Sequence, residues 1–138
     1  MLNRARTVGD YEAVPAAVEE SATRMLGAAI EVHRLLGPGL LESIYEKAFM
    51  HECALRNLQI KSQVPVIVQY KDLAIEGQRL DVYVEPGLIV ELKAVEKLLP
   101  IHEAQLISYL KSLKCRLGFL INFNVELLRM GGIKRIVN

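Results

Sequence analysis

The stretch that decides the fold is Leu88-Ile89-Val90-Glu91-Leu92-Lys93-Ala94-Val95. It is apolar and rich in β-branched residues, which is typical of a buried central strand. Glu91 and Lys93 interrupt it, and both charges project to the same side because residues two apart on a strand share a face. Buried charge is costly unless it is paired or binds a metal. A compensating group must therefore lie nearby, and another acid, Asp81, stands upstream in a second strand-like run.

Composition limits the class of protein. The chain has 138 residues, which is long enough for one domain with a real core. Its formal net charge of +1 lacks the basic excess of proteins that bind nucleic acid by charge alone. No apolar run is long enough to span a bilayer, and residues 1–10 contain no signal-peptide core, so we expect a cytoplasmic protein. Cys53 and Cys115 stand outside any zinc-like cluster, so we expect two reduced core thiols.

Helical spacing of apolar residues comes first along the chain. We interpret residues 1–14 as a loose arm before a single domain over 15–138. Helices are predicted over about 15–36 and 41–57, because Gly37-Pro38-Gly39 breaks the pattern between them.

Strand signals dominate the rest of the chain. Strands are expected over 64–70, 73–84, 88–95, 117–123 and 133–137, with a helix over about 100–113. Pro65 indicates an edge strand or a bulge. In the helix over 100–113, the pattern directs Ala104, Ile107, Leu110 and Leu113 inward. The order predicts an α/β fold: a three-strand meander, a helix crossover, and a mixed sheet of about four to five strands flanked by helices.

Acids, a lysine and polar side chains follow one another in a recognisable order: Glu42, Asp81, Glu91-x-Lys93 and Gln105-x-x-x-Tyr109. This order resembles the PD-(D/E)xK nuclease superfamily. More narrowly, Gly39-x-x-Glu42-x-x-Tyr45 resembles the signature that names the GxxExxY protein family, and residues 37–42, 91–96 and 102–105 are also similar to that family. The resemblance covers about residues 25–137. One departure is Leu80, which stands before Asp81 where the superfamily name has proline.

The resemblance implies a restriction-endonuclease-like core and a metal-dependent phosphodiesterase site. Asp81 and Glu91 would hold Mg²⁺, with Mn²⁺ as a substitute, and Glu42 would complete the shell directly or through water. Lys93 would orient the attacking water or neutralise developing charge. Gln105 and Tyr109 share a helix face and resemble a fourth motif that lines such sites. The implied catalytic set is therefore Lys93, Asp81, Glu91, Gln105 and Tyr109.

The leading hypothesis is a Mg²⁺-dependent nuclease acting on DNA rather than RNA, with a homodimer compatible with its small size. One alternative is a nucleic-acid-binding module that has lost turnover, although the intact Asp81, Glu91 and Lys93 speak against it. Another is a scaffold for protein interactions, which the near-neutral charge keeps open.

Each residue also has a structural interpretation. Asp81 with Lys93 could be an ion pair inside the fold, and Glu91 with Lys93 an exposed edge pair. Glu42 could simply complement a helix dipole. Gln105 and Tyr109 could be a helix rim and a core ring with a wet hydroxyl.

Counting residues in the loop before the central strand gives a geometric prediction. A two-residue loop would place Asp81 and Glu91 on opposite faces, because a shift of one flips every side chain. A three-residue loop, 85–87, pairs Val84 with Leu88 and sets Asp81 across from Glu91. Gly87 would then take a left-handed conformation. We predict an odd loop or a bulge, with both acids and Lys93 on the face that meets the second helix near Glu42.

Overall fold

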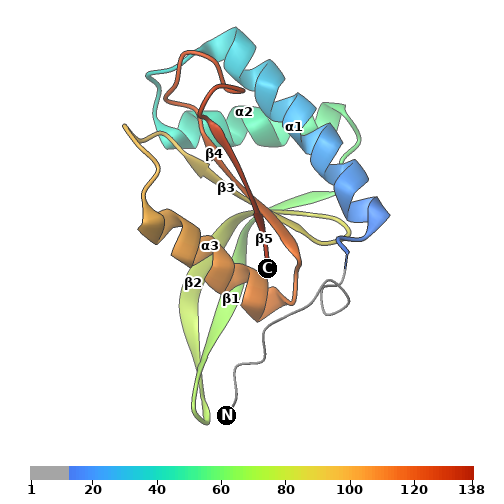
Figure 1. Cartoon of the computed structure of the whole chain (residues 1–138), viewed down its shortest axis with the longest axis vertical. Helices are drawn as coiled ribbons and strands as arrows, with labels where there is room; N and C mark the ends of the chain where they lie inside the picture. The colour runs from blue at the N-terminus through green and yellow to red at the C-terminus, as the bar shows by residue number, and fades with distance from the viewer. Residues whose placement is uncertain (1–12) are drawn as a thin grey trace.

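The computed structural model describes residues 13–138 and has the predicted α/β architecture. Figure 1 shows three helices around one sheet. In chain order the elements are α1 (Ala16–Leu36), α2 (Glu42–Leu55), β1 (Ile60–Tyr70), β2 (Leu73–Val84), β3 (Leu88–Lys93), α3 (Pro100–Leu113), β4 (Leu117–Asn122) and β5 (Ile133–Val137). The arm predicted over residues 1–14 falls almost entirely outside the described residues.

The sheet has the mixed topology that the sequence predicts. Its five strands lie in the order β1-β2-β3-β4-β5. The first three form an antiparallel meander, α3 then crosses over, and β4 pairs with β3 in parallel before β5 returns antiparallel. The central pair, β3 and β4, is almost wholly buried, which explains why both strands are continuous apolar runs.

Two hydrophobic cores lie on opposite faces of this sheet. Helices α1 and α2 cover one face, where Val90 and Leu92 of β3 pack with Tyr45, Phe49 and other side chains. Helix α3 covers the other face, where it packs on Ile89 of β3 and Leu120 of β4. Alternate residues of β3 therefore point to different helices.

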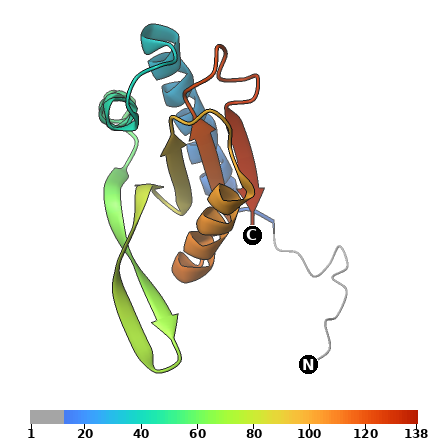
Figure 2. The same ribbon diagram turned by 90° about the vertical axis from the view of Figure 1, so that its left-hand side faces the viewer.

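The β1–β2 hairpin reaches well beyond the rest of the sheet, as Figures 1 and 2 show. Strand β1 begins at Ile60, four residues before the predicted start, because polar residues there still pair with β2. It is the edge strand that Pro65 indicates, and its register with β2 shifts between Val66 and Val68. Three apolar residues of its outer part are exposed: Ile67, Val68 and Tyr70.

Helix α3 packs with three of the four residues predicted to face inward, Ile107, Leu110 and Leu113, in its core. It buries Leu106, Tyr109 and Leu110, whereas the fourth, Ala104, is exposed. Leu106 packs closely over Gly118 of β4: a Cβ added at Gly118 would meet the Leu106 side chain at 2.9 Å. Only glycine allows the helix to approach the strand this closely.

Two simpler predictions are also resolved in the described part of the chain. Cys53 and Cys115 are both buried and unbridged, which confirms the two core thiols. Within residues 13–138, none of the helices combines the length and apolarity that crossing a membrane requires.

Candidate active site

The loop between β2 and β3 has the three residues that bring the two acids together. Val84 pairs with Leu88, and the ladder continues through Val82 and Val90, so Asp81 falls opposite Glu91. The Gly87 amide donates to the Val84 carbonyl at 3.1 Å. The predicted left-handed Gly87 is wrong: the turn instead contains a cis peptide bond between Glu85 and Pro86.

Beyond Val82 and Val90, the two acidic side chains replace the backbone ladder. The Asp81 amide donates to Oε2 of Glu91 at 2.6 Å. The Leu92 amide donates to Oδ2 of Asp81 at 2.9 Å. Each carboxylate thus bonds to the backbone of the opposite strand at the point where β2 separates from β3. The two acids are held side by side by backbone donors, which is a rigid way to position them.

Lys93 and Glu91 face α3 rather than α2. They lie on the same face of β3 as Ile89, which packs against α3. Lys93 also lines a hollow together with Gln105 and Ser108 of α3. The prediction that all three charged residues share one face is consistent with this register, but the predicted direction toward the second helix is wrong. The reason is that the crossover places α3, not α2, over this face.

Within residues 13–138, neither Asp81 nor Glu91 forms an ion pair with Lys93. The two structural interpretations of these charges, a buried ion pair and an exposed edge pair, are therefore wrong. Glu91 is 2% exposed, so it is no edge residue either.

The motif Gly39-x-x-Glu42-x-x-Tyr45 builds the start of α2. Gly39 has a φ of 100°, a conformation that glycine adopts without strain. The Tyr45 hydroxyl accepts from the Leu40 amide at 3.1 Å and donates to the Gly37 carbonyl at 2.5 Å. Its buried ring stacks on Phe123. The tyrosine therefore fixes the turn from which Glu42, the first residue of α2, projects.

Glu42 lies at the surface but within electrostatic reach of the other acids. Partial burial raises the pKa of its carboxyl, the charge of Asp81 raises it further, and Lys93 lowers it. Its place at a helix N-terminus fits the helix-dipole interpretation, yet its field also reaches the site. Glu42 therefore lies near Asp81 and Glu91 at the N-terminus of α2.

The two α3 residues take different positions. Gln105 is half-buried and lines the hollow that contains Lys93. The Tyr109 ring is buried, and its hydroxyl accepts from the Gln78 amide and donates to the Arg79 carbonyl at 3.3 Å. Tyr109 thus ties α3 to β2 a short distance from Asp81, and burial raises the pKa of its hydroxyl.

The order of these elements and residues agrees with one known family. The family model described as the PD-(D/E)XK nuclease superfamily matches residues 19–136. The chain belongs to this superfamily. No curated protein and no solved structure matches the chain significantly. The matched range contains every predicted site residue, from Glu42 to Tyr109.

Members of the PD-(D/E)XK superfamily are usually nucleases that use a divalent metal, so the fit of this site to such an ion matters. Burial, followed by the charge of Asp81, raises the pKa of Glu91 to about 8. Carboxylates crowded in this way are the oxygen donors that Mg²⁺ prefers, and a cation would relieve their repulsion.

The side chains of the described residues do not form a complete set of metal ligands. In residues 13–138, no three His, Cys, Asp or Glu side chains are grouped so that they could hold a metal ion as they stand. Glu42 is therefore not gathered into one ligand group with Asp81 and Glu91. Mg²⁺ commonly uses one or two carboxylates and keeps several waters, so the pair of acids suits it.

Asn122, at the end of β4, was not among the predicted site residues. It is 2% exposed. Its Oδ1 accepts from the Val95 amide at 3.0 Å, and its Nδ2 donates to the Val95 carbonyl at 2.9 Å. The Phe123 amide binds the Lys93 carbonyl at 2.9 Å. Asn122 thus secures the chain just after Lys93, and its polarity within the apolar run 117–123 was the signal available.

Proposed function

We propose that this chain is a divalent-metal-dependent nuclease of the GxxExxY family, which hydrolyses phosphodiester bonds in DNA in preference to RNA. The observation that carries the proposal is the meeting of Asp81, Glu91 and Lys93 where β2 separates from β3. Strand register brings Asp81 and Glu91 together, and Lys93 lies within electrostatic reach of Glu91 without an ion pair to either acid. This arrangement fits a catalytic role better than a structural one. A cytoplasmic location and a homodimer remain predictions.

Asp81 and Glu91 are the residues that would hold Mg²⁺ or Mn²⁺, with Glu42 reaching the ion through water. When bound, the ion supplies an activated water and neutralises charge on the phosphate in the transition state. The backbone donors to each acid keep one oxygen of the carboxylate occupied and orient the other. The protein therefore contributes two preoriented oxygens from adjacent strands.

Lys93 supplies the positive charge of the site. Its ammonium group forms no ion pair with any residue from 13 to 138, and it lines a hollow open to solvent. It can therefore meet a phosphate and stabilise the negative charge that grows as the bond breaks. Gln105, in the same hollow, can donate to a phosphate oxygen. Tyr109 acts as a positioning residue, because its hydroxyl holds β2 beside Asp81.

The test is cleavage of single-stranded, duplex, flap and junction substrates of DNA and RNA with Mg²⁺ or Mn²⁺. We expect products that EDTA abolishes. Lys93→Ala should lower the cleavage rate by roughly a hundredfold or more, because it removes charge stabilisation in the transition state.

Lys47→Ala is the matched control, because Lys47 is an exposed lysine of α2. It should cleave like the wild type. Absence of cleavage on every substrate with either metal would overturn the proposal, as would full activity of Lys93→Ala.

A further inference from the structure

A groove runs along α3 from Lys93 to the β1–β2 hairpin. It consists of two adjoining hollows, of about 540 Å³ at Lys93 and about 620 Å³ beside the hairpin. They adjoin because Gln105 and Ser108 line both. We call this combined space the α3 groove. One of its ends is thus at Lys93, the lysine of the candidate active site.

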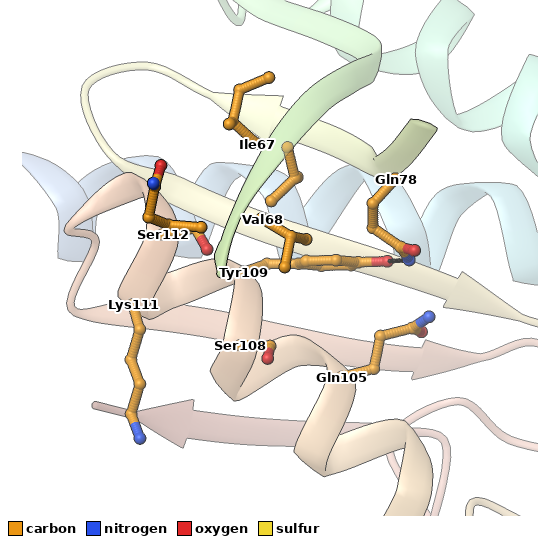
Figure 3. A pocket seen from close by; sticks show the side chains of 10 residues that line it. Ile67, Val68, Gln78, Gln105, Ser108, Tyr109, Lys111 and Ser112 are labelled. Carbon is orange, nitrogen blue, oxygen red and sulfur yellow. Dashed lines mark hydrogen bonds between the residues drawn. The ribbon is translucent and has the colours of Figure 1, made fainter. Parts of the chain in front are cut away.

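The two walls of the α3 groove differ in chemistry. Strand β1 contributes three aliphatic residues, Val66, Ile67 and Val68, and one amide, Gln69; Ile67 and Val68 are 46% and 44% exposed. Helix α3 contributes amide and hydroxyl groups from Gln105, Ser108 and Ser112. Figure 3 shows Ile67 and Val68 on one side of the Tyr109 ring, Gln105 and Ser108 on the other, and Gln78 at the tyrosine hydroxyl. A mainly aliphatic wall on β1 thus faces a mainly polar wall on α3.

Charge in the α3 groove is sparse and of one sign. Two lysines, Lys93 and Lys111, are among the residues that line the two hollows, and no aspartate or glutamate lines either. Lys111 stands at the rim and points away from the hairpin in Figure 3. A polyanion can therefore enter without repulsion. However, the groove lacks the row of cations with which proteins track the phosphates of a duplex.

We propose that the α3 groove binds a single strand of nucleic acid and leads its backbone to Lys93. Unpaired bases offer flat apolar faces and free hydrogen-bonding edges, which match the aliphatic and the polar wall respectively. A duplex hides its base faces and presents mainly phosphates, for which this groove has few partners. The inference rests on the proposed function for the identity of the ligand, but it concerns binding and not turnover.

Fluorescence anisotropy in EDTA tests the inference without cleavage. The probes are a labelled mixed-sequence DNA oligonucleotide, alone and annealed to its complement. We expect the single strand to bind at least about tenfold more tightly, with a shallow dependence on salt because few lysines are involved. Equal or tighter binding of the duplex would overturn the inference.

Variants locate the binding to the groove. Ser108→Trp and Ser112→Trp fill it from exposed positions, so each should fold and lower the affinity for the single strand by about tenfold. Thr23→Trp is the matched control, because it puts the same bulk on the exposed face of α1, whose buried side packs in the other core. Unchanged affinity in both groove variants would contradict the inference.

The inference and the proposed function fail in different ways. Duplex cleavage that Ser108→Trp leaves intact, together with equal binding of both probes, would overturn the groove assignment and leave the nuclease standing. Single-strand binding lost in Ser108→Trp, without cleavage under any metal, would support the groove and overturn the nuclease.

Discussion

Strands β3 and β4 run side by side, and each carries one polar side chain that is 2% exposed, Glu91 and Asn122. The side-chain amide of Asn122 makes three hydrogen bonds: its Oδ1 accepts from the amides of Val95 and Asn124, and its Nδ2 donates to the Val95 carbonyl. Glu91 accepts one backbone hydrogen bond, and its pKa is raised to about 8 by burial and by Asp81. Glu91 and Asn122 are thus equally buried, but the polar group of Asn122 is hydrogen-bonded at both ends, whereas the carboxyl of Glu91 is crowded by a second acid.

This difference between Asn122 and Glu91 helps to distinguish structural residues from functional ones in this fold. A buried neutral group that is hydrogen-bonded at both its oxygen and its nitrogen stabilises the chain around it. A carboxyl crowded against a second acid weakens the folded state at neutral pH, and such a cost is typical of a site that serves another purpose. We therefore assign Asn122 to the scaffold and propose Glu91 as a residue of the site.

The largest effect should come from removing the charge at Glu91. Glu91→Gln keeps the size of the side chain and an oxygen for the Asp81 amide, but it removes the negative charge that the ion requires. We expect the cleavage rate to fall by roughly a hundredfold or more while the free energy of unfolding stays equal or rises. Single-turnover cleavage and urea unfolding measure the two. Glu20→Gln, on the exposed surface of α1, is the control and should change neither.

Removing the amide at Asn122 should have the opposite effect on stability. Asn122→Ala leaves the amide and carbonyl of Val95 without these partners, so we expect a loss of about 2–4 kcal/mol in the free energy of unfolding. Asn124→Ala, at an exposed neighbour whose own bond to Val95 is long at 3.4 Å, should cost less than about 1 kcal/mol. Similar losses in both variants would remove the distinction between scaffold and site.

A smaller effect is the dependence of stability on pH in metal-free protein. The pKa of Glu91 rises from 4.5 to about 8 on folding, so between these values the folded chain holds a proton that the unfolded chain lacks. Stability should therefore fall as the pH rises through this window and level off above it. The difference between wild type and Glu91→Gln isolates this carboxyl. A difference that stays constant from pH 5 to pH 9 would show that burial does not shift its pKa.

Local signals predicted most elements of the fold. The bounds 73–84, 100–113 and 133–137 are those of β2, α3 and β5, because turn residues and apolar runs mark them. The pairing of Asp81 with Glu91 also followed from counting residues in one loop.

Features that depend on distant packing could not be predicted in this way. The face of Glu91 and Lys93 depends on where α3 returns after the crossover, and the close approach of Leu106 to Gly118 depends on how α3 meets β4. Likewise, Asn122 and Val95 are far apart in the chain, so no local sequence pattern predicts their contact. The start of β1 was missed because its polar residues are strand only through pairing with β2.

The most direct measurement of the central claim is thermal unfolding of wild type and Glu91→Gln with increasing Mg²⁺ or Mn²⁺. An ion held by Asp81 and Glu91 stabilises the folded state by mass action, about 2.7 kcal/mol when the free ion is a hundred times its dissociation constant. We predict that the unfolding temperature of the wild type rises with either metal and that Glu91→Gln does not respond. No rise in the wild type, or the same rise in both proteins, would contradict a metal site at these two acids.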